Sequence, residues 1–259
     1  MSNFEKISIV IITKNEEKNI KRCIENILDI SDEIIILDSK STDKTIEIIN
    51  SFKAEKINLY EIEWQGFGKT KNIGIEMAKN NWILSLDADE VVTEKLKLEI
   101  VEVLAENNKT NINGYYIPRR LFFCGREVKY GGTYPDYQLR LFKKNEGRFE
   151  TIEVHESLIL NGKKAYLKNF MKHYSYHSMF EYWERFNIYT ELDAKKKFNN
   201  HKKFRAYKIL VLFFEIFKRL FLKFGIFDGF PGIFYHIFSS ISSFVKYAKL
   251  WEIDNKKNL

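Results

Sequence analysis

A chain of 259 residues that is 45% hydrophobic and 30% charged can bury a large core, which excludes an intrinsically disordered protein. Its two cysteines, Cys23 and Cys124, match neither a zinc nor a redox spacing, so we expect reduced thiols in a cytoplasmic protein. The net charge of +7 is uneven, because residues 195–259 carry 14 Lys and Arg against 4 Asp and Glu, and this basic tail predicts contact with an anionic surface.

Apolar, β-branched runs alternate with amphipathic segments in the N-terminal part of the chain. Strands are predicted at residues 7–12, 33–38, 56–62 and 82–86, and helices at 16–30, 41–52 and 68–80. The opening apolar run is too short and wrongly flanked for a signal peptide. We expect Ser41 or Thr42 to cap the second helix, with Asp43 in its first turn. The alternation predicts βαβ crossovers and a parallel sheet.

The pattern changes in the second half of the chain. We predict a helix at 93–107 with Thr93 as its N-cap, an antiparallel or mixed sheet region over 114–132 and 137–150, and a helix at 179–197. From about residue 204 the chain is rich in Phe, Ile and Leu with interspersed Lys and Arg. The expected fold is therefore α/β, with a mostly parallel sheet flanked by helices in a domain at 1–200 and a helical tail at 201–259.

Polar side chains follow the predicted strands at the edge where parallel sheets bind ligands. Thr13, Asp38 and Asp87 each fall at, or just past, the C-terminal end of a strand. Asp87 and Asp89 in "LDADE" lie on one side of an extended chain, and two close carboxylates need a cation, for which Mg²⁺ or Mn²⁺ is suitable. A solvated acidic turn that caps the next helix is the alternative, as a plain turn is for Asp38.

Further candidates lie outside the acidic motif. Lys69 and Lys71, in "GFGKTKN", begin a predicted helix and suit phosphate oxygens, although a solvated helix start explains them equally well. Asp136, in "GGTYPDYQLRLF", could serve as a general base. His155, in "VHES", could complete a metal site, and a purely structural histidine is the alternative.

Six motifs occur in a specific order, although each is weak alone. They are "VIITKNEEKNI", "DEIIILDSKSTDKT", "WQGFGKTKNIGIEMAKNNWILSLDADE", "GGTYPDYQLRLFKK", "GRFE" followed by "VHES", and "FVKYAKLWE". Together they resemble the inverting family 2 glycosyltransferases, most closely the lipopolysaccharide-core β-glucosyltransferase branch, over about residues 5 to 252. The chain lacks the "QxxRW" signature and the paired transmembrane spans of the processive synthases of that family, so polymer extrusion is not expected.

The resemblance implies a GT-A fold that transfers a hexose from a nucleotide-diphosphate sugar, with UDP as the favoured nucleotide, to a glycan or glycolipid acceptor. A divalent metal, Mg²⁺ or Mn²⁺, is the implied cofactor. The implied donor and metal residues are Thr13 and Glu16 at the nucleoside, Asp38 at the base, Lys71 at the diphosphate, Asp87 at the ribose, and Asp89 and His155 at the metal. Asp136 matches the base that deprotonates the acceptor, and Glu156 competes with it for this role.

Two other functions stay open. One is a nucleotidyltransferase that uses the same metal site, and the other is a non-enzymatic, basic-tailed membrane-binding module. Nucleic acid is not an expected partner, because the aromatic residues of the tail stand among Ile and Leu. Residues 206–227 read as an interfacial helix, and 229–245 is a charge-free stretch at the lower limit of a spanning helix. We therefore expect a cytoplasmic protein, peripheral on the inner face of the plasma membrane, with a helical hairpin that packs on protein as the alternative.

Overall fold

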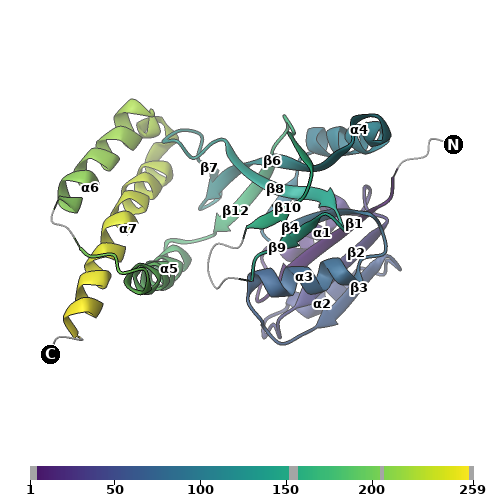
Figure 1. The fold of residues 1–259 in the computed structure, drawn as a ribbon, viewed down its shortest axis with the longest axis horizontal. Helices are drawn as coiled ribbons and strands as arrows, with labels where there is room; N and C mark the ends of the chain where they lie inside the picture. Colours follow the sequence, from purple (N-terminus) through teal and green to yellow (C-terminus); the bar gives the residue numbers. More distant parts are fainter. Residues whose placement is uncertain (1–4, 152–156, 205–206, 257–259) are drawn as a thin grey trace. The chain divides into compact units, whose positions relative to one another are not determined.

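The computed structural model describes residues 5–151, 157–204 and 207–256 (Figure 1). The chain forms two compact units. We call Met1–Arg119 with Asp136–His173 the sheet unit, and Arg120–Pro135 with Tyr174–Leu259 the helical unit. The helical unit therefore includes residues 120–135 and 174–200, which lie in the first of the two domains predicted from the sequence. The division into a catalytic domain and a tail stays a prediction.

In the part of the chain that the structure describes, the strands form a mixed sheet of ten strands and a separate two-stranded sheet. The order in the large sheet is β3-β2-β1-β4-β8-β6-β12-β5, with β7 and β11 paired to β6, and the small sheet pairs β9 with β10. The bounds are β1 (Ile7–Thr13), β2 (Glu33–Asp38), β3 (Ile57–Glu61), β4 (Trp82–Asp87), β5 (Glu90–Val92), β6 (Ile112–Phe123), β7 (Arg126–Glu127), β8 (Asp136–Lys143), β9 (Gly147–Phe149), β10 (Leu158–Leu160), β11 (Lys163–Tyr166) and β12 (Met171–Tyr176). Strands β1 to β4 are parallel, and β8 runs antiparallel to both β4 and β6. Both the parallel and the mixed part of the sheet were predicted.

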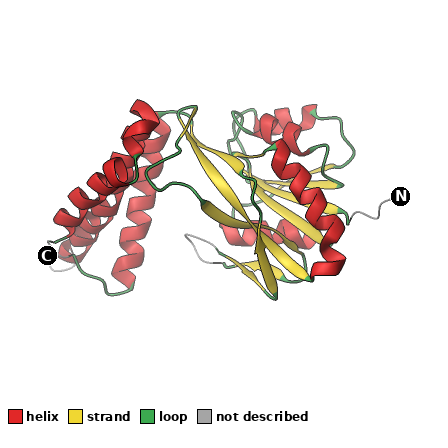
Figure 2. Cartoon of the chain, turned by 90° about the horizontal axis from the view of Figure 1, so that it is seen from above, coloured by secondary structure: helices red, strands yellow, loops and turns green. Residues whose placement is uncertain are grey.

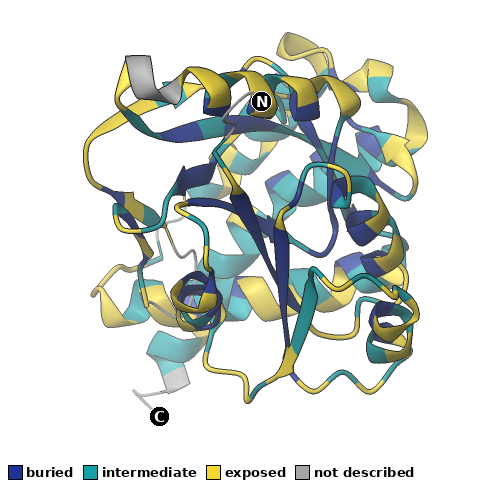
Figure 3. Ribbon diagram, turned by 90° about the vertical axis from the view of Figure 1, so that its right-hand side faces the viewer, coloured by how far each residue is buried: buried dark blue, intermediate teal, exposed yellow. Residues whose placement is uncertain are grey.

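Helices cover both faces of the parallel strands. They are α1 (Ile20–Ile27), α2 (Thr45–Ser51), α3 (Phe67–Met77) and α4 (Glu94–Thr110). On one face, side chains of α1 and α4 pack against Ile9 and Ile11 of β1, and on the other Ile75 of α3 packs near Val10. Figure 3 shows β1, β2 and β4 mostly dark blue, because these three strands are buried on both faces, whereas β3 at the edge of the sheet is half-buried to exposed. The two-sided burial explains why the three inner strands read as continuous apolar runs without alternation.

The start of α2 differs from the prediction. The helix begins at Thr45, and its N-cap residue is Lys44, whose own side chain makes no capping bond, so neither Ser41 nor Thr42 is the N-cap. The Ser41 hydroxyl donates to Asp38 instead, at 2.6 Å, and is held in the turn that follows β2. Asp43 accepts from the Thr45 amide at 3.0 Å and lies just outside the helix. A local side-chain bond has therefore displaced the predicted cap.

The described residues of the helical unit form three long helices (Figure 2). They are α5 (Met179–Asn199), α6 (Lys208–Phe217) and α7 (Gly229–Lys256), and a π-helical turn (Lys218–Leu222) and a 3-10 turn (Gly225–Asp228) join the last two. Helix α7 packs beside both α5 and α6. No helix within the described residues is both long enough and apolar enough to cross a membrane. The apolar stretch at 229–245 is thus part of a packed helix in this unit.

Candidate active site

The C-terminal ends of β1, β2 and β4 lie level with one another. Thr13 is the register partner of Asp38, and Ile12 is the partner of Asp87. The polar residues that end these strands therefore gather at one edge of the sheet, as predicted. This is the edge where open α/β sheets bind their ligands.

Buried hydroxyl groups mark the ends of β1 and β2. The side-chain oxygens of Thr13 and Ser39 are buried and have no hydrogen-bond partner within the described part of the chain. An unpaired buried hydroxyl costs roughly 1–3 kcal/mol, so such groups usually meet a ligand or water. The two oxygens therefore mark a place where polar groups of a ligand would be stabilised.

Asp38 and Glu16 make local contacts. Both carboxylate oxygens of Asp38 accept from Ser41, one from the amide at 2.7 Å and one from the hydroxyl at 2.6 Å. Asp38 is fully buried and begins a turn, which is the alternative that the sequence left open. Glu16 is partly buried and accepts from the side chain of Asn19 at 2.8 Å. The contacts of both residues with a nucleotide stay predictions.

The charges opposite Asp87 come from two basic side chains. Lys71 of α3 lies 2.9 Å from one carboxylate oxygen, and Arg140 of β8 contacts the other. Burial alone would raise the pKa of Asp87, but Arg140 and Lys71 lower it well below its ordinary range. The Asp87 charge, for which the sequence suggested a metal ion, is therefore balanced within the protein.

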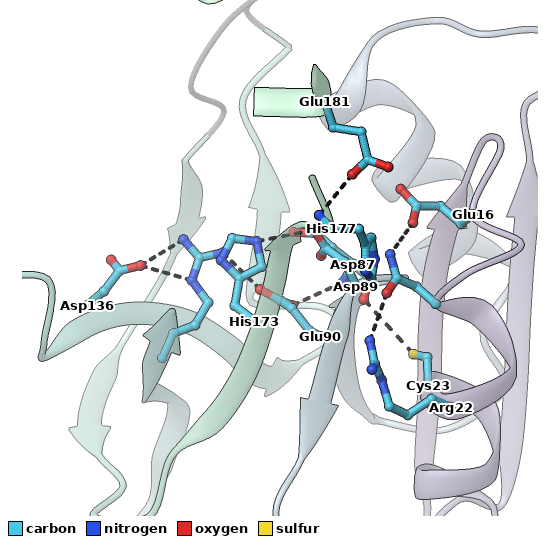
Figure 4. Close-up of polar contacts among 12 residues, drawn as sticks. Glu16, Arg22, Cys23, Asp87, Asp89, Glu90, Asp136, His173, His177 and Glu181 are labelled. Carbon is cyan, nitrogen blue, oxygen red and sulfur yellow. Dashed lines mark hydrogen bonds and ion pairs between the residues drawn. The ribbon is translucent and has the colours of Figure 1, made fainter. Parts of the chain in front are cut away.

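Glu90 lies at the centre of this charge network (Figure 4). Its side chain is 0% exposed, and it accepts from the Asp87 amide at 3.0 Å, from Arg119 at 3.0 Å and from Arg140 at 2.8 Å. Burial alone would lower the pKa of the Arg119 guanidinium, but the carboxylates of Glu90 and Asp136 raise it. Both arginines are therefore held as cations, with their guanidinium groups oriented by one buried carboxylate.

Asp136 begins β8 and is more exposed than its partners. Arg119 donates to one of its oxygens from Nε at 2.9 Å and from Nη2 at 2.7 Å, and Gln138 donates to the other at 2.8 Å. The Asp136 side chain is still 41% exposed. A carboxylate that is oriented by two neighbours and open to solvent suits a proton acceptor.

Asp89 lies beside a histidine that the sequence reasoning did not select. His173 of β12 places Nε2 3.3 Å from an oxygen of Asp89. A carboxylate and an imidazole are donor types that Mn²⁺ accepts, but the described residues hold no group of three or more such side chains. His155 and Glu156 lie outside the described residues. The residues present therefore fit a metal site in part, through Asp89 and His173.

The missed residues depend on how distant strands pair. Asp136 and Gln138 lie at alternate positions of β8, so their side chains project from the same face. Arg140 lies at a register irregularity in the pairing of β8 with β6, where simple alternation does not hold. Glu90 is the third acid of "LDADE" and could have been selected from that motif. The partner of His173 depends on the pairing of β12 with β5.

The chain is similar in sequence to known proteins. The family model described as "Glycosyl transferase family 2" matches residues 8–157. An uncharacterized glycosyltransferase of Rickettsia typhi is 30% identical over 262 residues, which cover 97% of this chain and 89% of that protein. The lipopolysaccharide core biosynthesis glycosyltransferase LpsC of Rhizobium meliloti is 28% identical, over 95% of this chain and 92% of that protein.

A solved structure is similar in fold. Residues 1–349 of TarS of S. aureus, crystallised with UDP-GlcNAc, superpose with a TM-score of 0.51 at 15% identity. The match covers 75% of this chain and 67% of that chain. The family match and the similarity to the Rickettsia typhi relative both indicate a family 2 glycosyltransferase. The α/β sheet agrees with the GT-A fold. The chain belongs to glycosyl transferase family 2.

Proposed function

We propose that this protein transfers a hexose from a UDP-linked sugar to a hydroxyl group of a lipid-linked or lipopolysaccharide-core acceptor, with inversion of the anomeric carbon. The observation that carries the proposal is the convergence of Thr13, Lys71 and Asp87 at the carboxyl edge of the sheet. The UDP-GlcNAc in the TarS structure supports the choice of donor. The name of the Rhizobium meliloti relative supports the choice of acceptor.

The donor binds at the ends of β1, β2 and β4. The Thr13 hydroxyl and Glu16 contact the nucleoside, Asp38 contacts the base, and Asp87 approaches the ribose. Lys71 and Arg140 both contact Asp87, so two cations lie together where the diphosphate has to be neutralised. Contact of Lys71 with the diphosphate would loosen its ion pair with Asp87.

Asp136 is the proposed base for the acceptor. Its exposed carboxylate takes the proton of the acceptor hydroxyl while that oxygen attacks the anomeric carbon. The bond from the anomeric carbon to the diphosphate breaks in the same step, and the nucleoside diphosphate leaves with the electron pair. A single displacement of this kind inverts the anomeric carbon. Glu156 remains the competing candidate for the base.

A donor panel tests the proposal as a whole. Purified protein is incubated with UDP-glucose, UDP-galactose and UDP-N-acetylglucosamine, with and without lipopolysaccharide core oligosaccharide, and the release of UDP is measured. We expect one donor to release UDP, faster with the acceptor than without it. Release of pyrophosphate from a nucleoside triphosphate would indicate a nucleotidyltransferase instead. If no donor is turned over, the non-enzymatic membrane-binding module is the remaining interpretation.

A divalent metal, Mg²⁺ or Mn²⁺, is part of the proposal, held by Asp89 with His173 or His155. When bound, the metal would neutralise charge on the departing diphosphate. Asp89→Ala is expected to abolish transfer while the circular dichroism spectrum and the melting temperature stay close to those of the wild type. Treatment with EDTA should inactivate the wild type, and added Mn²⁺ should restore it.

The control replaces an aspartate of the sheet unit that lies at the N-terminal ends of the strands, opposite to the site. Asp32 accepts from the Ile7 amide at the start of β1, so Asp32→Ala should change stability more than EDTA sensitivity. Full activity of Asp89→Ala in the presence of EDTA would refute the metal role.

The second half of the proposal is attachment to the cytoplasmic leaflet of the membrane. Large apolar side chains are exposed along α6, the turns that follow it and the start of α7: Leu210, Phe213, Phe214, Phe217, Phe221, Leu222, Phe224, Phe227 and Phe230. Lys208, Lys218, Arg219 and Lys223 belong to the same segment. Exposed apolar groups beside basic ones match an anionic lipid surface, which attracts each nearby Lys or Arg by about 1 kcal/mol.

Flotation with liposomes tests this attachment. The full chain should float with vesicles that contain phosphatidylglycerol and less with vesicles of phosphatidylcholine alone. The double substitution Leu210→Asp and Phe213→Asp should abolish flotation. Leu98→Asp in α4 is the matched control, because Leu98 and Leu210 are both 72% exposed. If the wild type floats with neither vesicle, the exposed side chains are not a membrane surface.

A further inference from the structure

Glycine stands at two consecutive positions in "GGTYPD", and the roles proposed above for the site residues do not explain why. They lie in residues 128–135, which we call the glycine loop. This loop connects β7 to β8 and leads directly into Asp136. Gly131 and Gly132 both have positive φ angles, +66° and +78°, which side chains other than glycine rarely adopt. The contacts of the loop show what this conformation achieves.

The carboxylate of Asp228 holds the loop backbone. One of its oxygens accepts from the Lys129 amide at 2.8 Å, and the other accepts from the Tyr130 amide at 3.0 Å. The Gly131 amide donates to the carbonyl oxygen of Lys223 at 2.8 Å. Three consecutive amides of the loop therefore donate to residues that precede α7, although about a hundred residues separate the partners along the chain.

We call these contacts of Asp228 and Lys223 with the loop the clamp, and a buried histidine adds to it. The side chains of His236 and Asp228 are 0% and 1% exposed, and Nε2 of His236 lies 2.8 Å from Asp228 Oδ2. The ring of His236 packs on the loop so closely that a Cβ atom at Gly131 would lie 2.0 Å from it. A Cβ atom at Gly225 would lie 2.6 Å from the same ring. Glycine at 131 is thus required by both the backbone conformation and the contact.

The anchoring extends almost to Asp136. The Thr133 hydroxyl donates to the carbonyl oxygens of Val128 and Tyr130, at 3.1 and 2.9 Å, and closes the loop on itself. The guanidinium of Arg120 lies 4.9 Å from the centre of the Tyr134 ring. Only Pro135, whose ring restricts its φ angle, then separates the anchored loop from Asp136.

We propose that Asp228 and His236 are positioning residues of the transfer reaction, because they hold the glycine loop that presents Asp136. The proposal rests on the function proposed above, in which Asp136 is the base. It makes the C-terminal helices part of the catalytic apparatus, whether or not they also contact lipid. Neither residue touches substrate, so the donor should bind equally well without them.

The test compares the full-chain wild type with Asp228→Ala and Asp228→Asn. In Asp228→Ala the amides of residues 129–131 should exchange with deuterium at least ~10-fold faster, while those of β1 to β4 keep their protection. The turnover of the donor and acceptor identified by the panel should fall ~10-fold or more, and the dissociation constant for UDP should stay unchanged. Asp228→Asn keeps one acceptor oxygen and should recover part of both losses.

Matched variants separate positioning from general damage. Asp193→Ala removes an aspartate of α5 that pairs with Lys246 of α7, the helix that contains His236. This substitution should change neither the deuterium exchange of the loop nor the turnover. Gly131→Ala disrupts the clamp from the loop side, because the added methyl group would collide with the His236 ring. It should reproduce the faster exchange and the lower turnover expected of Asp228→Ala. Unchanged loop exchange in both Asp228→Ala and Gly131→Ala would refute the clamp. Fast exchange with normal turnover would refute the positioning role, whereas a silent donor panel would refute the proposed function itself.

Discussion

Asp136→Asn is expected to lower the turnover of transfer by at least ~100-fold while the dissociation constant for UDP stays unchanged. The substitution keeps the size of the side chain and one acceptor oxygen, which can still accept from Arg119, but it replaces the oxygen that accepts from Gln138 with an amide nitrogen and removes the basicity of the group. General-base help is worth roughly 10²–10⁴-fold, so the loss should be large without unfolding the protein. The measurement is steady-state kinetics with the donor and acceptor that the panel identifies, together with equilibrium binding of UDP.

Two further variants decide the interpretation. Asp29→Asn is the matched control, because Asp29 also pairs with a cation, Lys97, but lies in the connection before β2. It should transfer at the wild-type rate. Normal transfer by Asp136→Asn together with failure of Glu156→Gln would assign the base to Glu156 and contradict our choice.

Arg140→Met is expected to destabilise the protein by about 3–5 kcal/mol, because it removes the buried cation that contacts both Asp87 and Glu90 and leaves each carboxylate with one cation, Lys71 or Arg119. Methionine retains much of the apolar bulk of arginine, so the effect should come mainly from the charge. Chemical denaturation measures the free energy of unfolding. Arg148→Met is the matched control, since Arg148 pairs with Glu76 at the surface and should lose less than ~1 kcal/mol. Equal losses in the two variants would contradict a buried network centred on Glu90.

The stability difference between the wild type and Arg140→Met should also depend on pH. Arg140 and Lys71 lower the pKa of Asp87 in the folded protein, whereas in the unfolded chain it titrates near ~3.9. The stabilisation should therefore be fully present above about pH 4 and be lost as the pH falls through the lower, folded-state pKa. Denaturation curves at pH 7 and at pH 3 measure the change. A difference that grows on acidification would contradict the ion pair.

The parallel strands and their polar ends could be predicted because their signals are local. A strand buried on both faces needs an unbroken apolar run, and parallel strands in register bring Thr13, Asp38 and Asp87 to one edge. The N-cap of α4 was also predicted correctly, since Thr93 accepts from the Leu96 amide at 3.4 Å. In each case a short stretch of sequence contains both partners or repeats a pattern with a known geometry.

The charge network could not be predicted in the same way. Arg140 reaches Asp87 because β8 is inserted antiparallel next to β4, and His173 reaches Asp89 because β12 pairs with β5. Both contacts depend on the register of strands that are far apart in sequence. The sequence suggested a cation beside two aspartates, and the protein supplies it at Asp87 with side chains from two other elements. The clamp on the glycine loop was hidden for the same reason.

The interleaving of the two units along the chain limits how this protein can be recombined with a relative. The path passes from one unit to the other after Arg119, Pro135 and His173, so the helical unit is assembled from two separate segments. A chimera that exchanges only the C-terminal helices with those of a relative would retain the original glycine loop, without the aspartate and histidine that match it. Residues 120–135 have to be exchanged together with 174–259 if the hybrid is to keep Asp136 in its place.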